Sequence, residues 1–285
     1  MDSFGSLELS DTEFSSIKDL VFSTTGICLG DSKKELVKRR FSPRVRELGL
    51  QSFGAYVHFV KKDGGGEINN FCNAITTNLT SFFRENHHFE FLASTVLPSI
   101  TERNAKNGRR LRVWSAGCST GQEPYCLAIT LHQTLRDLDR WDSRILATDL
   151  DDNVLSKARR GEYPVEEFSK TPKSVVDKYF TELPFTSTDV LAKPSLQAKH
   201  SIRNQIIFNK LNLMNKSWPM KGLFDVIMCR NVFIYFDKPT QRALVKRFAQ
   251  LQESGSYLFL GHSEVVQDPQ EIGYRLVGKT TYERL

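Results

Sequence analysis

Two glycines and one aspartate in the middle of the chain are placed to bind a nucleoside cofactor. Gly117 and Gly121 lie in a turn between an expected strand at residues 111–115 and the helix that follows it, where small residues let a ligand approach the backbone. Asp149 follows the next expected strand, at residues 144–148, and a carboxylate there can accept hydrogen bonds from ribose hydroxyls. A turn with two glycines is by itself more often a packing feature, so Asp149 is the residue that favours a nucleoside site.

The same region disfavours a dinucleotide cofactor. The third glycine of the dinucleotide fingerprint is absent, and the interval from Gly117 to Asp149 is longer than the roughly twenty residues that the fingerprint needs. Glu123, at the start of the helix, would repel a pyrophosphate and attract a cation. S-adenosylmethionine is an adenosine cofactor with a positive sulfonium and no phosphate. The pattern therefore predicts a methyltransferase that binds S-adenosylmethionine and releases S-adenosylhomocysteine.

Adjacent histidines at positions 87 and 88 raise the question of a metal site, since histidine is a frequent metal ligand. Neighbouring residues point in different directions on a helix, and no third ligand stands at a recognisable spacing. We therefore expect no metal, and we interpret His87 and His88 as packing residues.

The elements that would position these residues form an α/β domain. From about residue 109, short β-branched runs alternate with amphipathic helical segments, which is typical of a wound, largely parallel sheet. Further strands are expected at residues 205–208, 224–229 and 256–260, followed by a C-terminal hairpin at 274–284. Ligands of such sheets bind at the C-terminal ends of the strands, beside the first strand, where the strand order reverses. This fold would bring Gly117 and Asp149 together.

The first seventy residues predict a small all-helical domain. Ser10 and Glu13 match a capping box, and a second helix should begin near Asp31 and be interrupted or kinked at Pro43, with a short third helix after it. A lysine- and glycine-rich break at residues 61–66 marks the end of this domain.

A second irregular region follows in the α/β part. Between Gly161 and Gly222 the chain has five prolines and no glycine, and the stretch is too long for a simple crossover. We expect a small β-subdomain inserted at about residues 181–203.

Composition is that of a globular protein and leaves several partners open. The 285 residues carry a net charge of +6, so nucleic acid, a membrane surface or an acidic protein are all plausible partners. Residues 33–46 hold seven basic residues and one acidic residue, so the net charge of this segment equals the net charge of the whole chain. No run of about eighteen apolar residues is present. Five cysteines without a Cys-x-x-Cys pair suit reduced thiols, so we expect a cytoplasmic protein with no membrane insertion.

Six segments, taken together and in order, resemble the CheR-type chemoreceptor glutamate methyltransferases. They are NLTSFFRENHHF (78–89), SAGCSTGQEPY (115–125), ATDLD (147–151), LNL (211–213), CRNVFIYFD (229–237) and GHSE (261–264). The resemblance covers nearly the whole chain. It implies a helical receptor-docking domain at residues 1–72, a linker at 73–90 that contributes to the cofactor site, and a Rossmann-like class I methyltransferase domain at 91–285.

The resemblance also implies the residues that contact the cofactor, beyond Gly117 in the glycine turn. They are Asn78, Thr80, Arg84, Glu123, Asp149, Asn212, Leu213, Arg230 and Asn231. Several have a structural alternative: Asn78 or Thr80 could cap a helix, Arg84 could be a solvated charge, and Asn212 could be a turn residue. Arg230 and Asn231 directly follow a buried strand, which favours a functional role for them.

The reaction implied by the resemblance transfers a methyl group to a receptor glutamate and forms a γ-methyl ester. A carboxylate is already a nucleophile, so no general base is needed. The protein's task is to align the reacting atoms and to exclude water. Tyr235 and Arg84 are the candidates for orienting the incoming carboxylate.

The expected partner is the acidic helical bundle of a chemoreceptor's cytoplasmic domain. The basic run supplies the docking candidates, which are Lys38, Arg39, Arg40, Arg44 and Arg46. Some family members also bind a C-terminal pentapeptide of the receptor through a glycine-bearing part of the β-subdomain. Because this subdomain lacks glycine, binding of such a tether is doubtful. We expect a monomer.

Three alternatives remain open at this point. The acceptor could be a signalling partner outside chemotaxis. A nucleic-acid methyltransferase would suit the net charge, but Asp149, Asp151 and Asp152 make part of the expected cofactor face acidic. A catalytically silent scaffold would not need Glu123 or Arg230.

Overall fold

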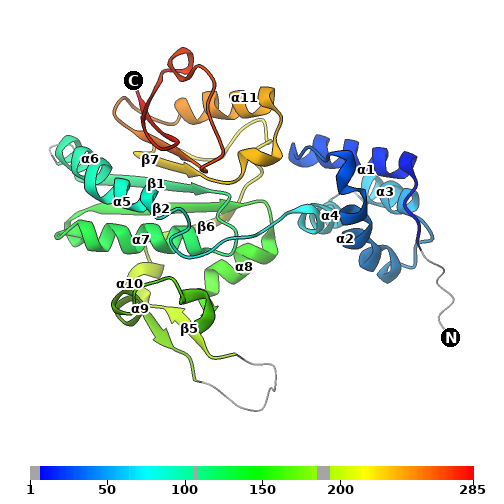
Figure 1. Cartoon of the computed structure of the whole chain (residues 1–285), viewed down its shortest axis with the longest axis horizontal. Coiled ribbons are helices and arrows are strands. Elements are labelled where there is room, and N and C mark those ends of the chain that lie inside the picture. The colour runs from blue at the N-terminus through cyan, green and yellow to red at the C-terminus, as the bar shows by residue number, and fades with distance from the viewer. Residues whose placement is uncertain (1–6, 64, 106–107, 185–192) are drawn as a thin grey trace.

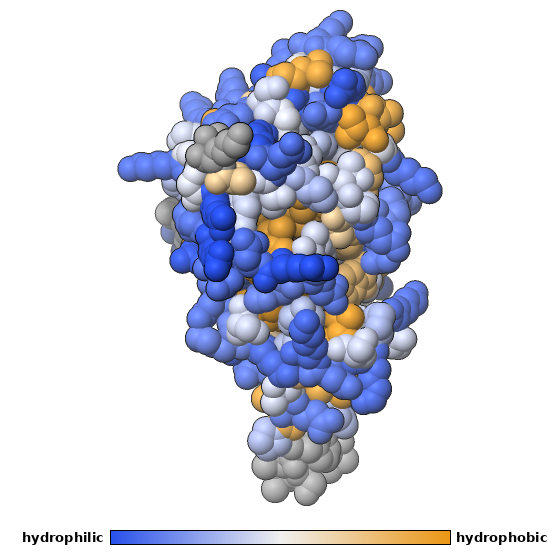
Figure 2. Space-filling view, turned by 90° about the vertical axis from the view of Figure 1, so that its left-hand side faces the viewer, coloured by the Kyte–Doolittle hydropathy of each residue, from blue (hydrophilic) through white to orange (hydrophobic). Residues whose placement is uncertain are grey.

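The computed structural model describes residues 7–63, 65–105, 108–184 and 193–285. An N-terminal helical domain and a larger α/β domain are joined by one extended linker (Figure 1). None of the described helices is long and apolar enough to cross a membrane. The face that lies opposite the helical domain is largely hydrophilic, with separate hydrophobic patches (Figure 2).

Four helices form the N-terminal domain. They are α1 (Asp11–Thr25), α2 (Lys34–Glu47), α3 (Phe53–Lys62) and α4 (Gly66–Ile75). The capping box of Ser10 and Glu13 is present at the start of α1. At the centre of the domain, the rings of Phe41 and Phe71 stack with their centroids 4.8 Å apart.

Two features of this domain differ from expectation. Helix α2 continues through Pro43 to Glu47 and is not interrupted there; Phe41 and Val45, buried on either side of the proline, hold both halves against the core. After the glycine-rich break a fourth helix, α4, packs on α2 and α3 and extends to Ile75. The helical bundle therefore reaches beyond residue 72.

A seven-stranded mixed sheet forms the α/β domain, in the order β6-β2-β1-β7-β8-β10-β9. The first five strands in this order are parallel, and β10 and β9 form the expected antiparallel C-terminal hairpin. The strands are β1 (Arg110–Ala116), β2 (Asp142–Asp149), β6 (Ile206–Lys210), β7 (Val226–Cys229), β8 (Tyr257–Leu260), β9 (Tyr274–Gly278) and β10 (Thr281–Arg284). The strand order reverses at β1, which confirms the expected position of the switch point.

Helices cover both faces of this sheet (Figure 1). They are α5 (His87–Phe91), α6 (Leu97–Asn104), α7 (Gln122–Thr134), α8 (Asp152–Arg160) and α11 (Lys238–Ala249), and a π-helical turn (Leu92–Val96) joins α5 to α6. Successive side chains of β1 point to opposite faces of the sheet: Val113 packs with α7, whereas Trp114 packs with Phe248 of α11. This two-sided burial explains why the strands read as continuous apolar runs.

The inserted β-subdomain is larger than the expected range of 181–203. Its three-stranded antiparallel sheet has the order β3-β5-β4. The elements are β3 (Glu162–Pro164), α9 (Lys173–Tyr179), β4 (Phe180–Glu182), β5 (Ser195–Ala198) and α10 (His200–Arg203). The subdomain therefore begins directly after α8, because the short strand β3 pairs with β5. Residues 185–192 of the expected insertion lie outside the described residues.

Candidate active site

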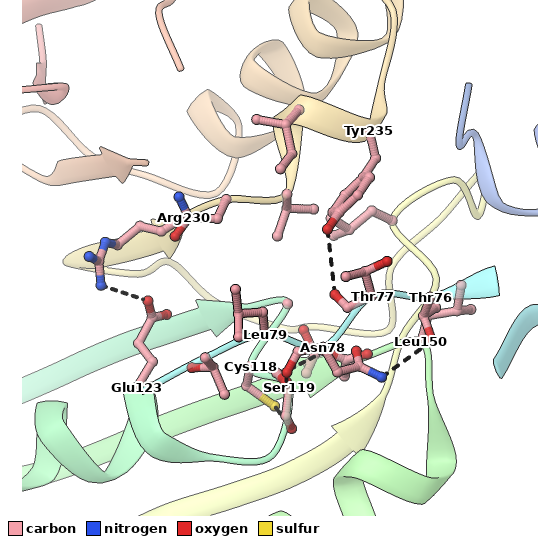
Figure 3. A pocket seen from close by; sticks show the side chains of 18 of the residues that line it. Thr76, Thr77, Asn78, Leu79, Cys118, Ser119, Glu123, Leu150, Arg230 and Tyr235 are labelled. Atoms are coloured by element: carbon pink, nitrogen blue, oxygen red, sulfur yellow. Dashed lines mark hydrogen bonds and ion pairs between the residues drawn. The ribbon is translucent and has the colours of Figure 1, made fainter. Parts of the chain in front are cut away.

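One cavity brings the sequence motifs together at the C-terminal ends of β1, β2 and β7. Its wall comes from the linker, from the loops that follow these strands and from the segment after α1. Figure 3 shows Arg230 facing Glu123 at one end of the cavity and Tyr235 near Thr77 at the other. The lining includes every expected cofactor or orienting residue: Asn78, Thr80, Arg84, Gly117, Glu123, Asp149, Asn212, Leu213, Arg230, Asn231 and Tyr235.

Gly117 lines the cavity directly after β1. Its φ of +85° lies in the left-handed region that favours glycine. A Cβ at this position would lie 2.4 Å from Cγ2 of Val232, so a larger residue fits only if the Val232 side chain moves. Gly117 therefore lets the glycine turn pack closely against the loop after β7.

Asp149 ends β2 with its carboxylate beside the glycine turn. Its two oxygens accept hydrogen bonds from the backbone N–H groups of Ser119, at 2.8 Å, and Asp151, at 3.0 Å. Burial raises the pKa of this carboxyl group, and the backbone hydrogen bonds oppose that rise. Each oxygen retains acceptor capacity, so the carboxylate is oriented to accept two hydroxyl groups.

Glu123 forms a buried ion pair with Arg230. Its Oε2 lies 3.0 Å from Nη1 of Arg230, and its Oε1 accepts a hydrogen bond of 2.7 Å from the hydroxyl of Ser115. Burial raises the pKa of Glu123, while the charge of Arg230 lowers it. Arg230 also contacts Glu85, at 3.2 Å, and the backbone carbonyl of Arg84. Two carboxylates thus surround one guanidinium, and this donor set favours a cationic ligand.

The linker crosses the cavity and is tied down by Asp151. Oδ2 of Asp151 accepts hydrogen bonds of 3.0 Å from both Thr76 Oγ1 and Asn78 Nδ2. The hydroxyl of Ser119 holds the backbone carbonyl of Asn78 at 3.1 Å. Asn78 caps no described helix, so its side chain serves to fix the linker.

Arg84, Tyr235, Asn212 and Leu213 form further parts of the cavity wall. Nη1 of Arg84 donates to the carbonyl of Leu79 at 2.8 Å, and the Tyr235 hydroxyl lies 3.5 Å from the carbonyl of Thr77. Asn212 does form a turn, because its Oδ1 accepts from the backbone of Met214. Leu213 is buried in the neighbouring core.

The N-terminal domain closes one side of the cavity. Nδ2 of Asn212 donates to the carbonyl of Thr24 at 2.6 Å, and the backbone N–H of Cys28 donates to the carbonyl of Tyr235 at 2.8 Å. Thr25 and Ile27, in the same segment, line the cavity. Nothing in the local sequence indicated this contact, because it joins segments about two hundred residues apart.

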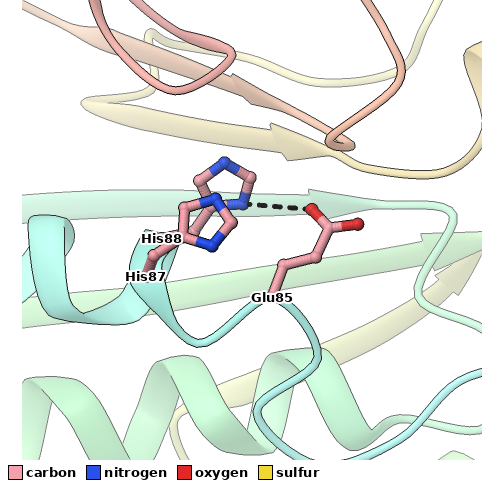
Figure 4. A group of neighbouring side chains, drawn as sticks. All are labelled: Glu85, His87 and His88. Atoms are coloured by element: carbon pink, nitrogen blue, oxygen red, sulfur yellow. Dashed lines mark ion pairs between the residues drawn. The ribbon is translucent and has the colours of Figure 1, made fainter.

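His87 and His88 do have a third potential ligand nearby, which the sequence spacing did not reveal. Ligand atoms of Glu85, His87 and His88 lie within 4.8 Å of one another (Figure 4). The carboxylate of Glu85 is already held by Arg230, by His262 at 2.8 Å and by the amide of Asn231 at 3.1 Å.

The pKa values of this cluster follow from the same contacts. Although burial opposes it, hydrogen bonds from His262 and Asn231 and the charge of Arg230 lower the pKa of Glu85 to about 2. Burial, together with the charge of Arg230, lowers the pKa of His88 to about 4. The cluster thus contains an ionised carboxylate already paired with a guanidinium, beside a neutral buried histidine.

The basic run on α2 divides into charges that have partners within the protein and charges that are exposed. Nη1 of Arg40 donates to the carbonyls of Ile75 and Thr76, at 2.7 Å each. Arg44 forms two hydrogen bonds, of 2.8 and 2.6 Å, with the buried carboxylate of Glu67. These two arginines hold α4 and the start of the linker.

The other three docking candidates are more accessible. Lys38 forms an ion pair with Glu8 at 2.8 Å on the surface. The side chains of Arg39 and Arg46 are exposed and make no hydrogen bond or ion pair within the part of the chain that the structure describes. Being seven residues apart, they lie on one face of α2.

Comparison with known proteins identifies the family. The model described as CheR methyltransferase, SAM binding domain, matches residues 78–282, and the one described as CheR methyltransferase, all-alpha domain, matches residues 12–76. A probable chemotaxis protein methyltransferase of Rhizobium etli is 40% identical over 92% of this chain and 96% of its own. Chemotaxis protein methyltransferase 2 of Pseudomonas aeruginosa is 39% identical over 98% of this chain and 96% of its own.

The chemotaxis protein methyltransferase of Escherichia coli is 38% identical over 97% of this chain and 92% of its own. These matches span both domains and include all six sequence motifs. The resemblance seen in the sequence is confirmed, and the chain belongs to the CheR family of S-adenosylmethionine-dependent chemotaxis protein methyltransferases.

Proposed function

We propose that the protein methylates glutamate side chains in the cytoplasmic domains of chemoreceptors, forming γ-methyl esters and S-adenosylhomocysteine. The observation that carries this proposal is the cavity in which Asp149, Glu123, Arg230 and the linker converge. It offers carboxylates for a ribose and a cation, and no phosphate-binding glycine loop. A nucleic-acid substrate is disfavoured, because the buried acidic groups would meet phosphates.

The cavity fits S-adenosylmethionine, which supplies a methyl group activated on a sulfonium. Asp149 accepts the ribose hydroxyls, and Gly117 lines the cavity beside it. The negative charge of Glu85 and Glu123, only partly balanced by Arg230, favours the cationic part. The residues assigned to the cofactor are Asn78, Thr80, Arg84, Gly117, Glu123, Asp149, Asn212, Leu213, Arg230 and Asn231.

The chain's own residues then align the acceptor and exclude water. Tyr235 and Arg84 line the same cavity and carry polar groups that can orient the incoming carboxylate. The linker and residues 25–27 cover part of the cavity and keep out water. Water would stabilise the charged reactants more than the less polar transition state, so its exclusion favours the reaction. A carboxylate nucleophile needs no general base and, in this proposal, no metal.

The exposed arginines of α2 supply the docking surface of the N-terminal domain. Arg39 and Arg46, with Lys38 beside them, would attract an acidic receptor helix and steer its approach. Recognition of a receptor C-terminal pentapeptide is not part of this proposal, because the β-subdomain has no glycine between residues 162 and 221. The protein would act as a monomer in the cytoplasm.

The test is to incubate the protein with methyl-labelled S-adenosylmethionine and purified chemoreceptor cytoplasmic fragments. The expected product releases its label as volatile methanol in mild alkali, because carboxylate esters are labile and methylated amines or bases are not. Fragments whose acidic residues in the methylation region are changed to alanine serve as the control and should remain unlabelled. Alkali-stable label, or label on nucleic acid added in competition, would refute the assignment. Dialysis against EDTA should leave the rate unchanged.

A further inference from the structure

The GHSE motif at residues 261–264 ends in a carboxylate with no part in the reaction described above. Glu264 is only 4% exposed and does not line the cavity. Its Oε2 accepts hydrogen bonds from the backbone N–H groups of Gly261, at 2.6 Å, and Asn231, at 2.9 Å. Its Oε1 accepts from the backbone N–H of Ile234 at 3.2 Å. One buried carboxylate thus binds backbone donors of two loops.

These two loops leave neighbouring strands. Strands β7 and β8 are parallel, with Cys229 opposite Leu260, so the segments that follow them lie side by side at the edge of the cavity. The segment after β7 contains Asn231, which lines the cavity with a φ of +60°. Asparagine adopts this left-handed conformation more readily than other residues apart from glycine. The carboxylate of Glu264 fixes the backbone at this position by accepting from the N–H of Asn231.

The same contact reaches Tyr235. The N–H group of Ile234 belongs to a 3₁₀ turn, Phe233–Tyr235, which presents the tyrosine to the cavity. Hydrogen bonds to an ionised acceptor are stronger than those between neutral groups, and the buried location protects them from competition with water. Both ends of the segment that supplies Asn231 and Tyr235 are therefore anchored on Glu264.

We propose that Glu264 is a positioning residue, which sets the backbone of residues 231–235 so that Asn231 and Tyr235 meet the cofactor and the incoming carboxylate. The inference rests on the proposed function for the roles of those two residues. The side chain of Asn231 is held separately, since its Nδ2 donates to Glu85 at 3.1 Å. Main chain and side chain are thus fixed by two different carboxylates.

Gly261 gives an independent sign that this contact is close-packed. A Cβ at Gly261 would lie 2.5 Å from Nδ2 of Asn231, 2.8 Å from its backbone nitrogen and 2.8 Å from Oε2 of Glu264. Since the φ of Gly261 is not in the left-handed region, alanine is excluded there by space alone. Gly261→Ala should therefore push the two loops apart in a variant that still has glutamate at position 264.

The experiment compares two pairs of variants. Glu264→Gln keeps the shape of the side chain but removes the charge and turns an NH₂ group toward backbone donors. Its matched control is Asp225→Asn. Asp225 is also buried, and it directly precedes β7, whereas Glu264 holds the loop that follows β7. It accepts a hydrogen bond of 2.8 Å from the backbone N–H of Arg112. Gly261→Ala is paired with Gly30→Ala, where a Cβ would meet nothing within 4 Å.

Three quantities are measured below the unfolding temperature of each variant: the Kd for S-adenosylhomocysteine by calorimetry, kcat on receptor fragments, and the Tm. Glu264→Gln and Gly261→Ala are expected to raise this Kd and lower kcat by about tenfold or more, as displacements of roughly 1 Å do in active sites. Asp225→Asn should lower Tm and leave both other quantities unchanged, and Gly30→Ala should change none of them.

The proposal is overturned if Glu264→Gln and Gly261→Ala change Tm alone, as Asp225→Asn does, because a purely structural role has that signature. Combining Glu264→Gln with Tyr235→Phe should lower kcat no further than the more damaging of the two single changes. Fully additive losses would contradict a role exerted through Tyr235. The calorimetric measurement needs no receptor, so failure of the glutamate-methylation proposal would be seen separately in the labelling test.

Discussion

Arg230 and Glu123 are joined by a buried ion pair, with 3.0 Å between Nη1 and Oε2, although 107 positions separate them in the chain. Their side chains are only 2% and 13% exposed. The pair connects the loop after β7 with the first turn of α7, and both residues line the cavity. The carboxylate of Glu85 lies 3.2 Å from Nη2 of Arg230, so two acidic side chains share one guanidinium.

Removing the guanidinium should therefore destabilise the fold. We expect Arg230→Ala to lower the free energy of unfolding by about 3 kcal/mol, because it leaves two buried carboxylates without a counter-charge. Urea denaturation at neutral pH measures the change. Arg242→Ala is the matched control, since its ion pair with Glu271 lies on the surface and should contribute less than about 1 kcal/mol. Equal losses in the two variants would contradict the structural importance of the buried pair.

The linker should lose its anchor in Asp151→Ala. Thr76 and Asn78 would no longer be held across the cavity, and the linker would have to be ordered each time a ligand binds. We expect the Kd for S-adenosylhomocysteine to rise by about tenfold. Because Asp151 also caps α8, the variant should lose about 1 kcal/mol of stability as well.

A neighbouring aspartate provides the control for that experiment. Asp152 pairs with Lys210 on the surface, at 2.5 Å, with its side chain 50% exposed. Asp152→Ala should leave the Kd for S-adenosylhomocysteine as in the wild type. If Asp151→Ala also binds the product normally, the linker does not need this anchor for ligand binding.

Charge reversal on α2 should separate docking from folding. We expect Arg39→Glu and Arg46→Glu to raise the KM for receptor fragments several-fold at low salt, by roughly 3- to 10-fold together. The effect should fade as salt increases, and the Kd for S-adenosylhomocysteine should not change. A KM that is unaffected at low salt would place the receptor on another surface.

Arg44→Ala should behave differently, although it removes a charge from the same helix. The carboxylate of Glu67 is buried and also accepts a hydrogen bond of 2.9 Å from Tyr56. Loss of its bidentate arginine is expected to lower the free energy of unfolding by about 3 kcal/mol, measured by urea denaturation. If Arg44→Ala has normal stability and a raised KM for receptor fragments, Arg44 belongs to the docking surface.

The different surroundings of Arg39 and Arg44 show which features of the structure could not be predicted from the sequence. The strand, glycine turn and helix around Gly117, and the acid at Asp149, could be predicted because local periodicity and a fixed topological rule decide them. The partner of Arg44 is Glu67, on a helix that had not been expected. Local sequence gives charge and spacing along α2, but it does not say which face α4 covers.

The same reason explains the other differences. Strand β3 has three residues, too few for a periodic signal, and it is defined by pairing with β5 more than thirty residues later. Glu85, Asp151 and Glu264 stand within motifs that were recognised in the sequence, yet their roles depend on backbone donors and side chains from distant segments. A motif therefore located these residues without indicating what they hold.

His88 should make stability depend on pH in a defined direction. Its side chain is 1% exposed, and burial together with the charge of Arg230 lowers its pKa from 6.5 to about 4. Between these values the unfolded chain binds a proton that the folded protein does not, so the contribution of His88 to stability falls as pH decreases from about 6.5 to about 4. The full difference amounts to about 3 kcal/mol, and none of this loss is present above pH 6.5.

Comparison with His88→Gln isolates this contribution from the carboxyl groups that titrate in the same range. Free energies of unfolding are measured by urea denaturation from about pH 7.5 to about pH 4 for the wild type and the variant. The variant cannot take up the proton, so the wild type should lose more stability on acidification and the gap between the two curves should change by about 3 kcal/mol. Curves that stay parallel would show that His88 binds its proton equally well in the folded and the unfolded protein. His58→Gln, at an exposed histidine of α3, controls for the loss of an imidazole elsewhere in the chain.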